Sequence, residues 1–254
     1  MAWYEARKGG GTGADQLAIM GSGTTFDFSE LQTHTSTIPQ YSFTSSAIRD
    51  IVSPYVTSVE ANAFQKAVSV RNISLPNCTV INASAFTCNR PITASSASSL
   101  AVSINLPSVV QIKENGFYGF GGKDTTAELE FPACTTLGNQ AFRATSASAF
   151  VVKSLSFPVV ETLGTSVFVS IVAETLDIGA TCTSMGTTPL ASATITNLIV
   201  RATTPPTLGT NAGLGNGANI THIYVPASAV SDYTDSTNYP RWAAYESIIS
   251  AIPE

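Results

Sequence analysis

Hydrophobic residues recur along most of this chain in one fixed phrase built around a proline. Val or Cys stands two residues after the proline, Val, Ile or Leu five residues after it, and Phe ten residues after it. The phrase begins at Pro54, Pro76, Pro107, Pro132 and Pro158, at intervals of 22, 31, 25 and 26 residues. Such repetition predicts a solenoid, in which each repeat buries its apolar face against its neighbours.

Weaker copies of the phrase extend the array in both directions. Before the first proline, Ile38 and Phe43 keep the five-residue offset. After the fifth copy, degenerate copies cover residues 178–190 and 198–208, and a final strand follows them. We therefore predict a repeat solenoid of about eight coils over residues 26–226.

Each coil divides into a strand, a bend and a loop. The residues before the proline alternate, as in Ile73 and Leu75, which predicts a short strand with one buried face. Proline ends that strand, where its missing backbone donor costs little. Four mostly small or polar residues before the Phe fit one helical turn or a tight bend, and loops rich in Ser, Ala, Thr and Gly follow the Phe.

The two ends of the chain depart from the repeat. Residues 1–25 are glycine-rich, which predicts a flexible arm. Trp3 and Tyr4 near its tip belong either to a disordered terminus or to an aromatic anchor that docks on a partner subunit. Residues 227–254 are predicted to form a helical cap, because apolar residues fall at helical spacing from Pro240 onward. That stripe consists of Trp242, Tyr245, Ile248, Ile249 and Ile252.

Several offsets recur together in the segments "SVEANAF", "VINASAF", "QIKENGF" and "TLGNQAF", which resemble BspA-type leucine-rich repeats. The tail "HIYVPASAVSDYTDSTNYPRWAAYESIISAI" is similar to the cap that often closes such arrays. The resemblance covers residues 26–254, and residues 178–214 depart from it because proline and Phe are lost there. It implies a leucine-rich-repeat-like fold of mainly short stacked β-strands, with turns or short helical segments and a C-terminal capping helix. It also implies attachment or protein binding, as in bacterial surface proteins and phages, without catalytic residues.

Charge and hydropathy limit the possible partners. Charged residues make up 11% of the chain, with 12 Lys and Arg against 17 Asp and Glu, and no basic run occurs. We therefore do not expect nucleic acid as a partner. The apolar stretches are too short to cross a bilayer, so we expect no membrane insertion. The start of the chain lacks a basic segment leading into an apolar core, and we expect no classical secretion signal.

Four cysteines suggest either metal or disulfide chemistry, but Cys78, Cys134 and Cys182 share a position of the repeat that Val occupies elsewhere. Coils about 4.8 Å apart would place cysteines two coils apart at roughly ten ångströms, beyond the limit of about 7 Å for bridged Cα atoms. We therefore expect buried free thiols. Because only His34 and His222 are present and no acidic pair has a catalytic spacing, we expect no metal, no cofactor and no enzyme activity.

Alternation along the strands predicts an exposed face with two columns of side chains. This face is mildly acidic at its centre and aromatic at its C-terminal end, and it is either merely solvated or a binding surface of the kind that solenoids commonly use. The first column contains Ser74, Asn105, Glu130, Ser156, Asp177, Ile199 and Tyr224, and the second contains Asn72, Ser103, Glu128, Ser154, Thr175, Asn197 and His222.

These observations lead to a hypothesis about function. We expect a non-enzymatic binding or structural protein, and specifically a decoration, head-fibre or tail-associated attachment protein of a phage or phage-like particle, located in the virion. The exposed face would meet a protein or cell-surface ligand, and the N-terminal arm would dock on capsid or tail subunits. The alternative is a bacterial surface or secreted adhesin domain located outside the cell.

Overall fold

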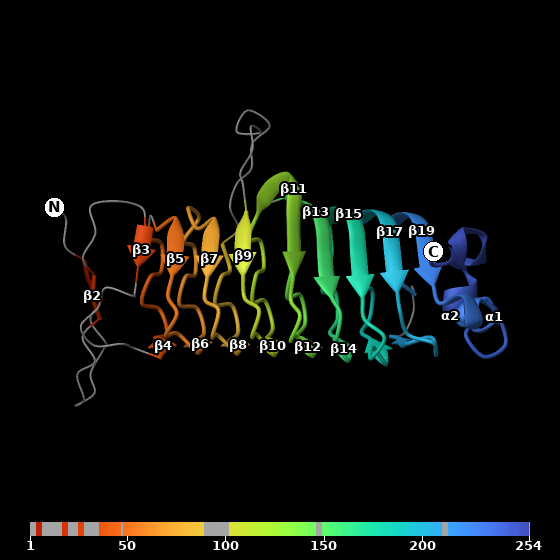
Figure 1. Cartoon of the computed structure of the whole chain (residues 1–254). Helices are drawn as coiled ribbons and strands as arrows, with labels where there is room; N and C mark the ends of the chain where they lie inside the picture. The colour runs from red at the N-terminus through yellow and green to blue at the C-terminus, as the bar shows by residue number, and fades with distance from the viewer. Residues whose placement is uncertain are drawn as a thin grey trace.

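The computed structural model describes five stretches of the chain and three short strands near its start. The stretches are residues 36–46, 48–88, 102–145, 149–209 and 213–253. The strands are β1 (Tyr4–Ala6), β2 (Leu17–Ile19) and β3 (Thr25–Asp27), and of these the backbone alone is described. The chain winds as a β-solenoid of about eight turns, whose strands follow one another along a single axis (Figure 1). The predicted repeat solenoid is therefore confirmed.

One wall of the solenoid is an eight-stranded parallel sheet that takes one two-residue strand from each turn. These strands form at the second apolar position of the phrase, so that Ile81, Ile112 and Leu137 stand in register in successive turns. The second residue of each strand is buried and the first faces outward, because successive side chains of a strand point to opposite sides. The strands are β4 (Thr37–Ile38), β6 (Ser58–Val59), β8 (Val80–Ile81), β10 (Gln111–Ile112), β12 (Thr136–Leu137), β14 (Thr162–Leu163), β16 (Ser184–Met185) and β18 (Thr207–Leu208).

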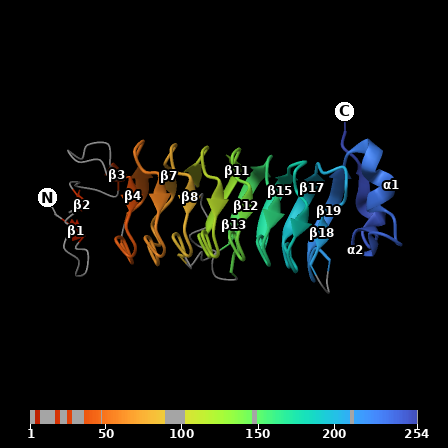
Figure 2. The same ribbon diagram turned by 90° about the horizontal axis from the view of Figure 1, so that it is seen from below.

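The other wall contains the strands that precede the proline, and it is divided into two parallel sheets. The four-stranded sheet consists of β3, β5 (Asp50–Val52), β7 (Asn72–Ser74) and β9 (Ser103–Asn105). The six-stranded sheet consists of β11 (Gly122–Glu130), β13 (Phe150–Phe157), β15 (Ile171–Ile178), β17 (Thr194–Val200), β19 (Asn219–Val225) and β20 (Ile249–Ala251). Seen from below, the successive turns lie side by side, and the helical cap stands at the C-terminal end (Figure 2).

A column of stacked phenylalanines fills the core between the walls. The Phe of each phrase is buried, as predicted, and its backbone N–H donates to a carbonyl of the next turn, as from Phe64 to Ala85 over 2.8 Å. Offset stacking stabilises such pairs beyond the area that they bury. The column comprises Phe43, Phe64, Phe86, Phe117, Phe142 and Phe168, with successive ring centroids 5.0 to 6.0 Å apart.

The segment before each Phe is a tight bend, which decides between the two predicted possibilities of a bend and a helical turn. The residue two positions before the Phe has a positive φ, for example 59° at Asn62 and 57° at Asn115. Asn tolerates this left-handed conformation better than most residues. The chain can therefore reverse direction within a few residues and return to the next strand.

The C-terminal cap differs from the helix predicted from Pro240 to Ile252. Helix α2 (Pro240–Ala243) is short, and the chain continues as the 3-10 helix η4 (Glu246–Ile248) and strand β20. β20 pairs with β19, which satisfies backbone groups that a helix would leave open at the edge of the sheet. The remaining helical elements are η3 (Ala227–Ala229) and α1 (Val230–Tyr233).

Two buried aromatic side chains of the cap close the end of the solenoid. The indole N–H of Trp242 donates to the carbonyl of Pro206 at 2.7 Å, and the hydroxyl of Tyr233 donates to the carbonyl of Ala202 at 3.0 Å. Burial raises the pKa of Tyr233 well above its ordinary value. The cap thus closes the last turn with aromatic side chains and one additional strand.

Candidate functional site

The two predicted columns lie side by side on the outward face of the six-stranded sheet. Ser154, Thr175, Asn197 and His222 are in register across β13, β15, β17 and β19. The first column is equally regular, and the buried residues between the columns support both of them from below. The members of the first column on this sheet are Glu130, Ser156, Asp177, Ile199 and Tyr224.

The other predicted members of the columns lie on the four-stranded sheet, whose last strand, β9, contacts β11. Asn72, Ser74, Ser103 and Asn105 lie in register on the four-stranded sheet, and no pairing joins β9 to β11 in the described part of the chain. On this sheet, the amide of Asn105 donates to the hydroxyl of Ser74 at 3.2 Å.

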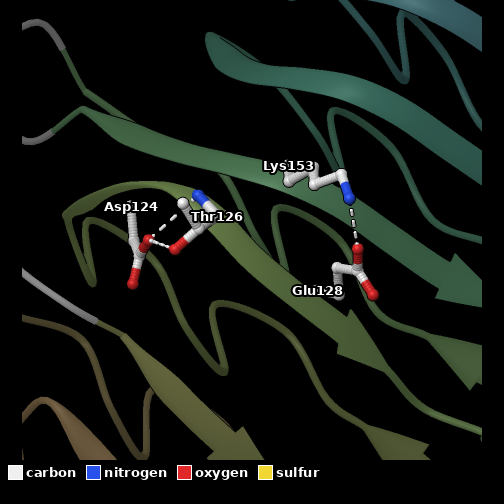
Figure 3. A network of polar contacts seen from close by, with 4 residues as sticks. All are labelled: Asp124, Thr126, Glu128 and Lys153. Carbon is white, nitrogen blue, oxygen red and sulfur yellow. Dashed lines mark hydrogen bonds and ion pairs between the residues drawn. The ribbon is translucent and has the colours of Figure 1, made fainter.

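Strand β11 contains a local irregularity in its pairing with β13. The register of β11 shifts between Asp124 and Glu128. There the carboxylate of Asp124 accepts hydrogen bonds from the backbone N–H of Thr126 at 3.0 Å and from its hydroxyl at 2.7 Å (Figure 3). These bonds lower the pKa of Asp124. A side chain that bonds its own backbone two residues on favours a turn over a regular ladder.

Basic side chains pair with two of the three predicted acidic residues. Lys153 donates to the carboxylate of Glu128 (Figure 3), and this hydrogen bond lowers the pKa of Glu128 and raises that of Lys153. The guanidinium of Arg201 holds both carboxylate oxygens of Asp177, with distances of 2.9 and 2.7 Å, and this bond raises the pKa of Arg201. Glu130 has no such ion pair among the described residues. The acidic centre is therefore weaker than the sequence predicted.

The C-terminal end of the face combines uncharged polar groups with an aromatic pair. The rings of His222 and Tyr224 stack with their centroids 5.7 Å apart and their planes 22° from parallel. Neither β17 nor β19 contains an acidic or basic residue apart from His222. Exposed Thr196 and Thr221 lie beside the predicted columns on these strands, and the sequence analysis did not identify them.

The proposed N-terminal anchor falls mostly outside the described residues. Trp3 is not described, and of Tyr4 the backbone alone is described. Tyr4 begins β1, which pairs antiparallel with β2 so that Tyr4 stands opposite Ile19. The aromatic anchor remains a prediction.

The cysteines are free and buried, in agreement with the structural role predicted for them. Burial raises the pKa of Cys78 to about 11 and those of Cys134 and Cys182 to about 12. Such thiols hold almost no thiolate at neutral pH, and the thiolate is the reactive form. In the part of the chain that the structure describes, no group of three or more His, Cys, Asp or Glu side chains is placed to hold a metal ion. No described helix is long and apolar enough to cross a bilayer.

The fold and its repeated phrase define a leucine-rich-repeat solenoid. More particularly, the family described as "BspA type Leucine rich repeat region" matches residues 22–105 and 95–196 in six copies. These residues make up more than half of the chain, and the protein belongs to this family. Leucine-rich repeats of this kind suggest a protein-binding or structural role and are typically non-enzymatic. No curated protein matches the chain.

Proposed function

We propose that this protein is a non-enzymatic attachment component of a phage or phage-like particle, as a decoration, head-fibre or tail-associated protein located in the virion. The observation that carries the proposal is the outward face of the six-stranded sheet. Its side chains stand in register on a rigid wall, and those on β17 and β19 make no hydrogen bonds to other described residues. A preorganised surface loses little conformational freedom on binding, which favours affinity.

A second feature supports attachment to a particle. Strands β1 and β2 pair with each other, and the phrase of the repeat begins only after them. The segment that carries Trp3 and Tyr4 would therefore dock on capsid or tail subunits, and the solenoid would bind the ligand. Such a division leaves the exposed face accessible after incorporation into the particle.

The alternative is a bacterial surface or secreted adhesin domain located outside the cell. It rests on the same exposed face and on the composition of the chain, since a surface rich in Ser, Thr and Asn with 11% charged residues suits an extracellular setting. The two proposals differ in where the protein is found and not in the surface that it uses.

Quantitative mass spectrometry of purified particles and of cell-envelope fractions from the same culture tests the choice between them. We expect the protein to copurify with a capsid subunit at a constant ratio, and we expect the double variant Trp3→Ala, Tyr4→Ala to lose this association while its solenoid stays folded. Absence from particles together with enrichment in the envelope would favour the adhesin. Incorporation of the double variant into particles at the wild-type level would show that Trp3 and Tyr4 are not the anchor.

A further inference from the structure

Hydroxyl groups on the two walls differ in whether their hydrogen-bonding capacity is used. Near the eight-stranded sheet, threonines donate to backbone carbonyls of the preceding turn, as Thr79 does to Thr57 at 3.1 Å and Thr183 does to Glu161 at 3.3 Å. At the C-terminal end of the six-stranded sheet, six side chains make no hydrogen bond to any described residue, and their donors and acceptors are available to a ligand. We name these six the polar-aromatic patch: Thr175, Thr196, Asn197, Thr221, His222 and Tyr224.

The charges around the patch narrow the class of ligand. Two acidic residues of β15 flank the patch. Arg201 occupies both carboxylate oxygens of Asp177. Glu174 is exposed beside Thr175, and the positive charge of Lys153 lies near enough to interact with it. The patch itself contributes no carboxylate, ammonium or guanidinium group. Charged partners are recognised by surfaces of complementary potential, and an anionic polymer or a charged protein surface would find no unpaired opposite charge on β17 and β19.

The functional groups that remain match those of a sugar. Hydroxyls of Thr both donate and accept hydrogen bonds, and the amide of Asn197 offers two donors and an acceptor. The hydroxyls of a sugar have the same dual capacity, and the C–H face of its ring packs on aromatic rings such as those of His222 and Tyr224. Adjacent strands lie about 4.8 Å apart, so the patch offers these groups at a regular spacing on a rigid support.

We propose that the polar-aromatic patch binds an uncharged glycan of a cell surface, with a sugar ring packed on the His222 and Tyr224 pair and its hydroxyls bonded to Asn197 and the flanking threonines. The inference rests on the proposed function as an attachment protein and specifies the chemistry of its receptor. A long neutral polysaccharide fits best, because the outward columns continue along the wall from the patch toward β13.

The experiment uses the full-length protein on an array that carries neutral, sialylated and sulfated glycans. We expect binding to neutral glycans, and we expect Tyr224→Ala and Asn197→Ala each to weaken it about tenfold or more, as removal of central contacts commonly does. Tyr224→Phe should retain most of the binding, because the ring remains. Thr162→Ala, on the outward position of β14 in the opposite wall, is the matched control and should bind as the wild type does.

Thermal melts of each variant separate lost contacts from lost folding. Thr196→Ala, at an exposed position, provides a further variant that should fold and still bind more weakly than the wild type. Binding confined to sialylated or sulfated glycans, or absence of binding to any neutral glycan, would overturn the proposal. Unchanged binding by the folded Asn197→Ala and Tyr224→Ala variants would overturn it as well. Incorporation into particles is measured separately, so the glycan proposal can fail while the particle assignment stands.

Discussion

The two halves of the solenoid place the same repeated phrase in different sheets. In the N-terminal half, the strands before the proline are three residues long and form the four-stranded sheet. From β11 to β19 they are seven to nine residues long and form the six-stranded sheet. The eight-stranded wall runs through both halves without a break. The phrase therefore determines one wall and the core, and the segments between copies of the phrase shape the wall that bears the candidate site.

The halves also differ at the residue that directly follows each strand of the eight-stranded sheet, where the chain turns a corner. In the C-terminal half this corner is glycine, and a Cβ on Gly164 would lie 2.6 Å from the backbone nitrogen of Asn139. In the N-terminal half the corner carries polar side chains: the amide of Asn82 donates to the carbonyl of Val59 at 3.1 Å, and Lys113 donates to Asn82 at 2.8 Å. One half closes its corner by close backbone approach and the other by side-chain bridges between turns.

The largest predicted effect tests whether the phenylalanine column couples the halves. Phe117 is buried at the middle of the column, 5.1 Å from both Phe86 and Phe142. We expect Phe117→Ala to lower the free energy of unfolding by about 3–5 kcal/mol, because it removes stacking and leaves a cavity. Urea unfolding with hydrogen exchange should show weakened protection on both sides of position 117. Phe117→Leu should cost much less, and loss of protection on one side alone would show that the halves unfold separately.

A smaller effect tests the difference between the corners. Gly164→Ala should destabilise the protein by about 1–3 kcal/mol, because the new methyl group meets backbone that cannot rotate away. Asn82→Ala, at the matching corner of the N-terminal half, should cost about 1 kcal/mol through loss of its hydrogen bonds. Chemical denaturation of both variants provides the comparison. Equal losses would show that the corner chemistry does not distinguish the halves.

The buried thiols give a pH-dependent prediction that covers both halves. The pKa values of Cys78 and Cys134 are raised, so the stability that these protonated thiols contribute is present below pH 9.0, the ordinary value, and is lost as the pH rises toward 11 and 12. At pH 8 we expect Cys78 and Cys134 to react with iodoacetamide far more slowly in the folded protein than in urea. Rapid labelling of either cysteine under native conditions would show that its turn opens locally.

The smallest expected effect concerns the ion pair between Arg201 and Asp177. Arg201 is half-exposed, and pairs of this kind contribute about 0–1 kcal/mol, so Arg201→Ala should shift the denaturation midpoint only slightly. The shift should shrink further in high salt. A loss of several kcal/mol would mean that the pair holds β15 and β17 together and does not merely balance charge on the face.

The sequence predicted those features that depend on strict repetition. The alternation before each proline placed Asn197 and Tyr224 correctly in their columns, and the shared position of Cys78 and Val56 identified a buried thiol. It did not predict the outward position of Lys153, because counting by two from Phe157 assigns this lysine to the buried face. An irregularity of β13 next to Lys153 turns it outward to meet Glu128.

Other features depend on contacts between distant parts of the chain. Glycine replaces proline at position 179 because a Cβ there would lie 1.9 Å from the carbonyl oxygen of Pro158. This close approach between turns is visible only in the folded structure. The helical spacing after Pro240 predicted a helix that includes Ile249. Instead, Ile249 lies in a strand, because the edge of β19 offers backbone groups with which it pairs. The irregularity of β11 likewise coincides with a side-chain turn at Asp124 that periodicity does not predict.

We propose the outward face of the six-stranded sheet as the recognition surface, and binding of the labelled full-length protein to intact bacterial cells provides a direct test. The triple variant Asn197→Ala, His222→Ala, Tyr224→Ala is compared with a matched variant of the opposite wall, Thr136→Ala, Thr162→Ala, Ser184→Ala. We predict that the first weakens binding about tenfold or more while the second binds as the wild type does. Equal binding by the two folded variants, or a loss confined to the second, would contradict the claim.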